Sequence, residues 1–256
     1  TPLYSSAASD VYKRQGQAML LAAGRGERMR PLTDQTPKPL LAVQGQPLLG
    51  WSLAQMAAGG IRRVVINTAW LGEQIEARFG AETPTAHGPL TVRYSHEQPP
   101  GAGFSALETA GGISRALPWL DAVFWVAAGD VFVPDFVFDA QALARFADSE
   151  HLAHVWLVPN PPHNPRGDFG LTAQGLATSR PAEGETGYTF STIGLYRREL
   201  FDEPWFELAP GNPDGAKAAL APLLRLAMDA GRVSAQLYSG RWTDVGTPER
   251  LAELNR

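Results

Sequence analysis

The sequence contains no cysteine, and this absence limits the chemistry available to the protein. Disulfide bonds, catalytic thiolates and cysteine-ligated metals are all excluded. The sequence also lacks any apolar run near the ~18 residues that a membrane-spanning helix requires. Residues 1–16 lack the apolar core of a secretory signal. We therefore expect a cytoplasmic protein that does not contact a membrane.

A broad excess of positive charge is missing too. The 26 Asp and Glu residues outnumber the 22 Lys and Arg residues, and the formal net charge is −4. General nucleic-acid binding depends on extended positive surfaces, so we expect no nucleic-acid partner. The five histidines show no metal-like spacing beyond His151 and His154, and we interpret that pair as structural.

The remaining composition is that of a globular protein, with 44% apolar and 19% charged residues. Residues 1–16 have no useful periodicity, and we interpret them as a disordered or non-native leader. We expect a single domain over residues 17–256, because the length suits one large domain and no low-complexity linker divides it.

Apolar strand-like segments alternate with helix-like segments, which indicates an α/β fold with a central, mostly parallel mixed sheet flanked by helices. Pro222 is expected to kink or restart one of the helices. The expected strands cover residues 18–22, 63–68, 90–95, 122–128, 151–158, 169–171, 188–196 and 233–238. The expected helices cover residues 47–58, 71–79, 106–117, 139–147, 217–228 and 247–254.

The first strand runs into LAAGRGERMRPLTDQTPKPL, from Leu21 to Leu40. A dinucleotide-binding turn needs a third glycine and a helix that follows directly, but Met29 takes that glycine's place and Pro31 interrupts the segment. No Gly-Lys-Ser/Thr triplet of a P-loop is present. The segment therefore predicts an extended loop.

This loop would lie at the carboxyl end of a strand, where open α/β sheets bind ligands. Backbone N–H groups of residues 23–26 can line its floor, and Arg25, Arg28 and Arg30 could contact anionic phosphates. Lys38 stands between two prolines, which restrict its backbone and present one ammonium group. Any one of these charges could be a solvated loop residue, but the pattern as a whole favours a phosphate site.

LAAGRGERMRPLT…TPKPLLAVQGQPLL also strongly resembles the signature of sugar-1-phosphate nucleotidyltransferases, and the resemblance extends over residues 17–255. Members of that family join a nucleoside triphosphate and a sugar 1-phosphate into a nucleotide sugar and pyrophosphate. The resemblance implies a Rossmann-like nucleotidyltransferase fold. It implies that Arg25 and Arg28 face the triphosphate and that Lys38 bridges the α-phosphate and the sugar phosphate. The nucleotide-binding residues that it implies in this segment are Leu21, Ala22, Ala23, Gly24 and Gly26.

Two aspartates suit a magnesium site. Asp130 follows the apolar strand AVFWVAAGD, and Asp244 lies in RWTDVGTPE just before the last expected helix. Each alone could cap a helix or sit in a turn. Together with the opening loop they favour Mg²⁺, which takes one or two carboxylates besides phosphate oxygens. The resemblance assigns the metal ligands to these same two positions.

Further positions are candidates for the base and the sugar. The resemblance implies that Gly111 lies under the base, although close helix packing is an alternative explanation of that glycine. Glu97 or Gln98 could read the pyrimidine edge. By the resemblance, Asp168 would bind sugar hydroxyls or the N-acetyl group, and Thr192 would line the same pocket.

Within the family, the chain most resembles members that act on N-acetylmuramate 1-phosphate, which implies UTP and N-acetylmuramate α-1-phosphate as substrates in peptidoglycan recycling. The lactyl carboxylate of that sugar needs a cation, for which Arg166 is the candidate. Three departures from the family pattern are Ala128 in place of an asparagine, an apparent insertion over residues 99–105, and Ser-Arg-Pro at residues 179–181.

Alternative interpretations are a mannose-1-phosphate guanylyltransferase, another sugar-1-phosphate nucleotidyltransferase, or an inactive nucleotide-sugar sensor. We expect a monomer or a small homo-oligomer.

Overall fold

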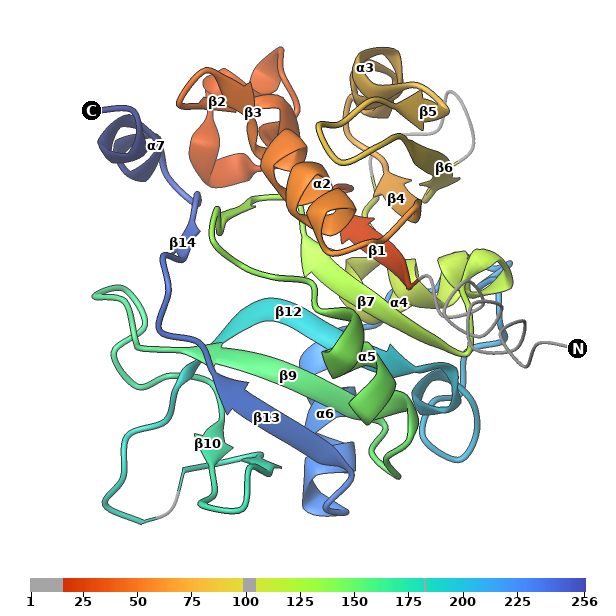
Figure 1. Cartoon of the computed structure of the whole chain (residues 1–256), viewed down its shortest axis with the longest axis vertical. Helices are drawn as coiled ribbons and strands as arrows, with labels where there is room; N and C mark the ends of the chain where they lie inside the picture. Colours follow the sequence, from red (N-terminus) through yellow and green to blue (C-terminus); the bar gives the residue numbers. More distant parts are fainter. Residues whose placement is uncertain (1–15, 99–104, 182) are drawn as a thin grey trace, which may run out of the picture.

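A central sheet of eight strands organises the computed structural model, which describes residues 16–98, 105–181 and 183–256. The strand order is β13-β9-β12-β7-β1-β4-β6-β5 (Figure 1). Strands β7, β1, β4 and β6 are mutually parallel, β9 and β13 are parallel to each other, and β12 and β5 run antiparallel to their neighbours. The predicted mostly parallel mixed sheet is thus confirmed. The strands are β1 (Gln17–Leu21), β4 (Arg63–Thr68), β5 (Glu82–Thr83), β6 (Leu90–His96), β7 (Val123–Ala128), β9 (Ala153–Val158), β12 (Thr189–Arg197) and β13 (Val233–Leu237).

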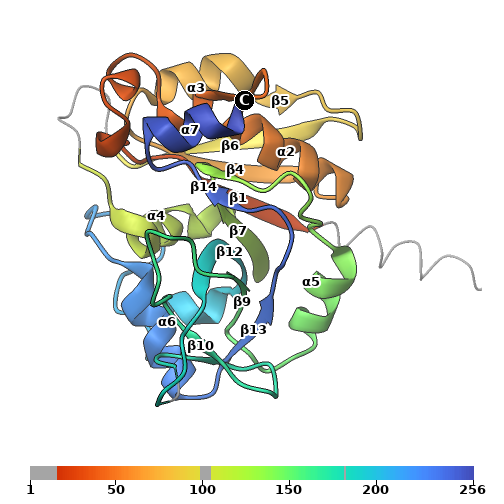
Figure 2. The same cartoon turned by 90° about the vertical axis from the view of Figure 1, so that its left-hand side faces the viewer.

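Helices cover both faces of this sheet. In Figure 2, α5 and α6 lie on opposite sides of it. One face packs against α2 (Leu48–Ala58), α3 (Gly72–Phe79) and α5 (Ala140–Ala147). The other face packs against α4 (Glu108–Ala116) and α6 (Leu220–Asp229). Strands β1 and β7 read as continuous apolar runs because both of their faces are buried.

Successive side chains of a strand point to opposite faces of the sheet, so the core consists of two clusters, one on each face. In β7, Trp125 faces the α2 side while Phe124 and Val126 face the α4 side, and all three are essentially inaccessible to solvent. Trp125 stacks on Trp156 of β9 with ring centroids 4.9 Å apart. Successive side chains point to opposite faces of a strand, so a sheet covered on both sides needs apolar residues at nearly every position.

Pro222 was expected to kink or restart its helix; it lies at the start of the helix and does not kink it. Helix α6 begins at Leu220, so Pro222 lies in its first turn. The first four backbone N–H groups of a helix have no partner within the helix, and proline therefore loses nothing there. The helix also begins three residues later than predicted, and α4 likewise begins at Glu108 instead of residue 106.

Two expectations lie almost wholly outside the described residues: the leader over 1–16 and the insertion over 99–105. Within the described ranges, no helix has both the length and the apolar character needed to cross a membrane.

Candidate functional site

A cavity of about 560 Å³ opens where β1, β4, β6 and β7 reach their carboxyl ends. This volume is in the range of small-molecule sites, and its place at the strand ends is where α/β folds bind ligands. Apolar side chains from β12 and α6, among them Phe190, Tyr196 and Leu224, form part of its wall. The cavity brings together six of the residues predicted from the sequence: Leu21, Ala23, Gly24, Glu97, Asp130 and Thr192.

The loop after β1 folds as three short 3₁₀ turns, at Glu27–Met29, Leu32–Asp34 and Lys38–Leu40. Gly26 begins the first turn with a left-handed φ of 67°. A Cβ added to Gly26 would lie 3.0 Å from Thr33 Cγ2 and 3.3 Å from the Cβ of Lys38. Glycine therefore lets the start of the loop approach the Lys38 turn.

Arg25 braces this loop from within. Its guanidinium donates to the carbonyl oxygen of Thr33 at 2.8 Å and to Asp34 at 2.7 Å, and it lies 3.7 Å from the centroid of the Trp70 ring. The hydrogen bond from Arg25 lowers the pKa of Asp34, and Arg30 adds to the effect. Only 13% of the Arg25 side chain is exposed, and Arg25 does not line the cavity. Its contact with the triphosphate stays a prediction.

Arg28 differs from its neighbours. It is exposed, and within residues 16–98, 105–181 and 183–256 its side chain has no hydrogen bond or ion pair. Arg30, in contrast, donates to Asp34 at 2.9 Å. Arg28 is thus a cation that can turn to a ligand without breaking a hydrogen bond or ion pair seen among the described residues.

Lys38 links the loop to the end of β7. It is 9% exposed, and its Nζ lies 2.5 Å from Oδ2 of Asp130. The side chain of Asp130 is 39% exposed and borders the cavity. A buried ammonium group is thereby held beside a carboxylate that solvent and ligands can reach.

A short antiparallel ladder brings Asp244 next to Asp130. Strand β14 (Thr243–Asp244) pairs with β8 (Val131–Phe132), so that Asp244 lies opposite Val131, and Val245 N–H donates to the Asp130 carbonyl oxygen at 3.0 Å. The two predicted metal-binding residues therefore stand on adjacent backbones, although they are far apart in the sequence.

Asp244 has cationic neighbours of its own. Arg250 of α7 (Pro248–Leu254) donates to Oδ1 of Asp244, and His163 Nε2 lies 3.0 Å from the same oxygen. No group of three or more His, Cys, Asp or Glu side chains in the described part of the chain is arranged to hold a metal. Asp130 and Asp244 are partly exposed carboxylates, the kind of ligand that Mg²⁺ takes besides phosphate oxygens and water, and of the two only Asp130 lines the cavity. Neither His163 nor Arg250 was predicted from the sequence.

A small apolar cluster packs together the three segments that carry Arg28, Asp130 and Asp244. Met29 follows Arg28 in the loop, Phe132 lies two residues after Asp130, and Val245 follows Asp244. Helix α7 covers the cluster with Leu251 and Leu254, and Asn255 at its end bonds to the backbone of Ala42 and Gln44. The buried members of the cluster are Met29, Leu41, Val43, Leu48, Phe132 and Val245.

Glu97 is 4% exposed, and both of its carboxylate oxygens are already in use. Oε1 accepts from Asn67 Nδ2 at 2.6 Å, and Oε2 accepts from the backbone N–H of Leu107 at 2.8 Å. Burial raises the pKa of Glu97, and the two donors oppose that shift. Gln98, the other base-reading candidate, has a buried side-chain nitrogen without a hydrogen-bond partner among the described residues.

Asn67, which sequence reasoning missed, also lines the cavity, and its Oδ1 accepts from the N–H of Ala22 at 2.7 Å. The available signal was a polar residue near the carboxyl end of the strand RRVVINT.

Gly111 is explained by packing. A Cβ there would lie 2.7 Å from the carbonyl oxygen of Ala216, and the N–H of Gly111 donates to Ala218 O at 3.0 Å. Gly111 does not line the cavity. The alternative of close packing thus accounts for this glycine, and a contact with the base stays a prediction.

Asp168 ties the proline-rich loop to β12. Its Oδ2 accepts from Phe190 N–H at 2.8 Å, and its Oδ1 accepts from Asn164 at 3.2 Å. The side chain of Arg166 is exposed, without a hydrogen bond or ion pair in the described part of the chain. Neither Asp168 nor Arg166 lines the cavity.

Thr192 lies in the cavity wall at an irregularity of β12. Its φ is 65°, and the register with β9 shifts between Phe190 and Gly194. A non-glycine residue in this left-handed region is strained. Such bulges re-aim side chains beside binding sites, which fits the place of Thr192.

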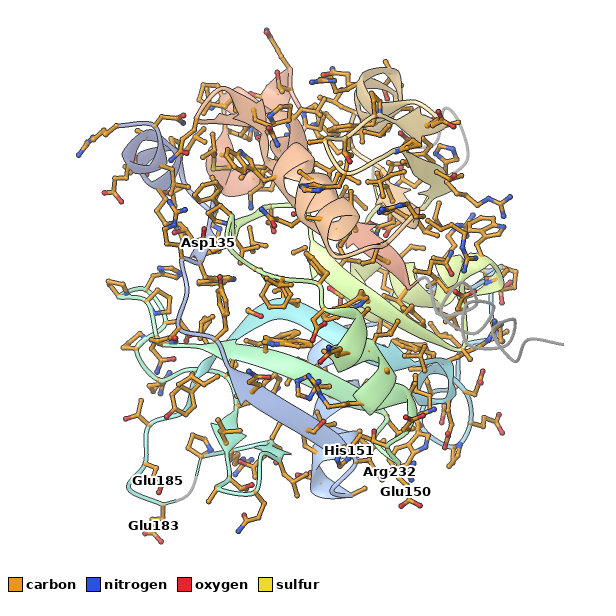
Figure 3. The ribbon with its side chains drawn as sticks, in the orientation of Figure 1. Asp135, Glu150, His151, Glu183, Glu185 and Arg232 are labelled. Carbon is orange, nitrogen blue, oxygen red and sulfur yellow. The ribbon has the colours of Figure 1, made fainter. Side chains whose placement is uncertain are left out.

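A second hollow, of about 370 Å³, lies near the amino ends of β9 and β13. Glu150 and Arg232 line it, and Figure 3 shows these two residues close together with His151. Arg197 in its wall donates to four backbone carbonyl groups between residues 146 and 151, which closes the end of α5. We therefore assign a structural role, and no binding role, to the residues that line this hollow.

Comparisons with known proteins agree with the geometry. A family model described as "Nucleotidyl transferase" matches residues 17–256. The chain is 50% identical over 240 residues to the N-acetylmuramate alpha-1-phosphate uridylyltransferase of Neisseria meningitidis serogroup B, covering 93% of this chain and 96% of that protein. It is 30% identical over 249 residues to the protein of the same name from Caulobacter vibrioides, covering 92% and 97%.

Among solved structures, a putative glucose-1-phosphate thymidylyltransferase from Bacillus anthracis has a TM-score of 0.71 at 21% identity, covering 93% of each chain. That structural similarity supports the α/β fold described above.

Proposed function

Because the chain belongs to the nucleotidyl transferase family, we propose that it joins UTP and N-acetylmuramate α-1-phosphate into UDP-N-acetylmuramate and pyrophosphate. The observation that carries the proposal is the 50% identity, over nearly the whole of both chains, to a protein named for this activity. We further propose a cytoplasmic role in peptidoglycan recycling, in which the enzyme would activate the sugar 1-phosphate.

The reaction needs no nucleophile from the protein. An oxygen of the sugar phosphate attacks the α-phosphorus of UTP, a new P–O bond forms, and the bond to the leaving pyrophosphate breaks. The sugar phosphate is already ionised at neutral pH, so the protein's task is to align two anions and balance their charge. Lys38 is suited to the attacking phosphate because its ammonium group stands beside the cavity residue Asp130. Arg28, exposed and unengaged among the described residues, is suited to the leaving pyrophosphate.

Mg²⁺ is the cofactor that we propose, with Asp130 and Asp244 as its protein ligands. Both carboxylates are partly exposed; Asp244 lies in β14, and Asp130 directly precedes β8, the strand with which β14 pairs. When bound, the ion would neutralise charge on the phosphate oxygens.

The proposed sugar carries a lactyl carboxylate that glucose and mannose lack. Arg166 is the residue that we propose to meet it, since its side chain is exposed and makes no hydrogen bond or ion pair among the described residues. Arg166→Ala should lose more activity with N-acetylmuramate 1-phosphate than with N-acetylglucosamine 1-phosphate, which lacks the carboxylate. Equal losses would refute this role for Arg166.

The proposal as a whole is tested by pyrophosphate release from a matrix of nucleoside triphosphates and sugar 1-phosphates. We expect the highest kcat/KM for UTP with N-acetylmuramate α-1-phosphate. A preference for GTP with mannose 1-phosphate would instead identify a guanylyltransferase. Binding of nucleotide without pyrophosphate release from any pair would favour an inactive sensor.

A further inference from the structure

Two buried polar side chains in the cavity wall join four elements, β1, β4, β6 and α4. Asn67 near the end of β4 accepts from Ala22 N–H, just past β1, at 2.7 Å and donates to Glu97 at 2.6 Å. Glu97, just past β6, accepts from Leu107 N–H, directly before α4, at 2.8 Å. Asn67 is 3% exposed and Glu97 is 4% exposed. The chain Ala22–Asn67–Glu97–Leu107 therefore connects the two sides of the cavity.

The chemistry of this chain fixes its orientation. Ala22 presents an N–H, so the amide oxygen of Asn67 must face Ala22 and its NH₂ group must face Glu97. Glu97 meets an N–H donor at each oxygen, which an ionised carboxylate satisfies and a carboxamide does not. One amide and one carboxylate, in this order, satisfy every contact.

Gly112 leaves the space that the side chains of Asn67 and Glu97 occupy. A Cβ at Gly112 would lie 2.5 Å from Oε1 of Glu97 and 2.9 Å from Nδ2 of Asn67. The φ of Gly112 is not in the left-handed region, so contact with the pair, and not backbone conformation, explains the glycine. Helix α4 thus packs directly onto the hydrogen bond between Asn67 and Glu97.

We infer that Asn67 and Glu97 form a positioning pair that sets the separation between the backbone of residues 21–24 and the start of α4, and so shapes the nucleotide subsite. The pair acts through Ala22 and Leu107, whose neighbours Leu21, Ala23 and Ala106 line the cavity. The inference rests on the proposed function in one respect, namely that UTP occupies this part of the cavity.

An exchange of the two groups provides the test. Asn67→Asp would place two carboxylates 2.6 Å apart without a donor between them, and Glu97→Gln would turn an NH₂ group toward an N–H donor. In the double variant Asn67→Asp/Glu97→Gln, the new carboxylate accepts from Ala22 N–H and from the new amide, whose oxygen accepts from Leu107 N–H. All three hydrogen bonds and the net charge are restored.

Each single variant should raise the KM for UTP about tenfold, since each leaves a buried polar group unsatisfied. The double variant should return to within about threefold of wild type. The KM for the sugar 1-phosphate should change less than that for UTP in both single variants. A double variant no better than the worse single variant, or equal changes in both KM values, would overturn the inference.

Gln17→Glu is the matched control. Gln17 lies at the opposite end of β1, is 4% exposed, and bonds to the backbone of Trp119 at 2.6 Å and of Asp121 at 2.8 Å. Its replacement should lower the melting temperature but leave the KM for UTP unchanged, and a rise equal to that of Asn67→Asp would show only general destabilisation. Calorimetric titration of the wild type with UTP separates the two proposals: absence of UTP binding refutes the proposed function, whereas binding without rescue in the double variant refutes the positioning pair alone.

Discussion

Replacing Arg250 by glutamine should strengthen the binding of a divalent cation at the two aspartates. Arg250 donates to the Asp244 oxygen that also faces His163, and the Arg250 side chain is only 16% exposed. A metal ion that binds Asp244 must share this carboxylate with the guanidinium or displace it. Arg250→Gln removes the competing charge, while the amide can still donate a hydrogen bond.

The size of the effect follows from how far the pair is buried. Two unit charges 4 Å apart interact with about 1 kcal/mol in bulk water and about 4 kcal/mol near a protein surface. Measured values for exposed pairs are ~0.2–1 kcal/mol. Because 26% of the Asp244 side chain is still exposed, we use about 1 kcal/mol, the upper end of that range. Since about 1.4 kcal/mol is tenfold, affinity should rise about fivefold.

Titration with Mn²⁺, followed by the electron paramagnetic resonance signal of the free ion, measures this affinity without nucleotide or turnover. Arg241→Gln is the charge-matched control, because Arg241 donates to Asp135 at 2.7 and 2.9 Å on the outside of the protein near β14 (Figure 3). The control should change the affinity by less than twofold, about 0.4 kcal/mol, as expected of a charge that does not touch the site. Equal or weaker Mn²⁺ binding by Arg250→Gln, or an equal gain in the control, would refute the competition.

Two other predictions concern the same carboxylates and the core. Asp130→Asn and Asp244→Asn should each abolish pyrophosphate release and weaken Mn²⁺ binding with an unchanged circular dichroism spectrum, and near-normal activity of either would remove that residue from the metal site. Burial, with help from His151 and Arg145, lowers the pKa of His154 from 6.5 to about 4. Between pH 6.5 and pH 4, His154 is therefore protonated in the unfolded chain but neutral in the folded chain. The free energy of unfolding should be highest above pH 6.5 and fall as the pH drops toward 4, by up to about 3 kcal/mol. Urea unfolding at several pH values measures this, and His154→Gln should flatten the profile; an equally steep profile in that variant would contradict the assignment.

Most of the fold could be predicted from the sequence because its signals are local. The runs before Gly24 and Gly129 are apolar at nearly every position, as strands covered on both faces must be. The start of α6 was misplaced because Pro222 suits the first turn of a helix as well as it breaks the middle of one. Sequence alone did not distinguish those two positions.

The site could be predicted only in part, because its side chains are held by contacts between distant segments. Asp130 and Asp244 stood out from their own surroundings, but the ladder of β8 and β14 that joins them is visible only in three dimensions. Asn67 looked like the polar end of a strand, and its role depends on Ala22 and Glu97.

The cations of the opening loop are of two kinds, and the difference bears on catalysis. Arg25 is held by a carbonyl group, a carboxylate and an aromatic ring, and Lys38 is held by Asp130. Among the described residues, Arg28 is the one cation of this predicted set without such a partner. Electrostatic catalysis works best with groups fixed in advance, because they need not reorganise as charge develops. A fixed ammonium beside the cavity therefore suits the reacting phosphate, whereas the unengaged Arg28 suits the pyrophosphate, which must be bound and then released.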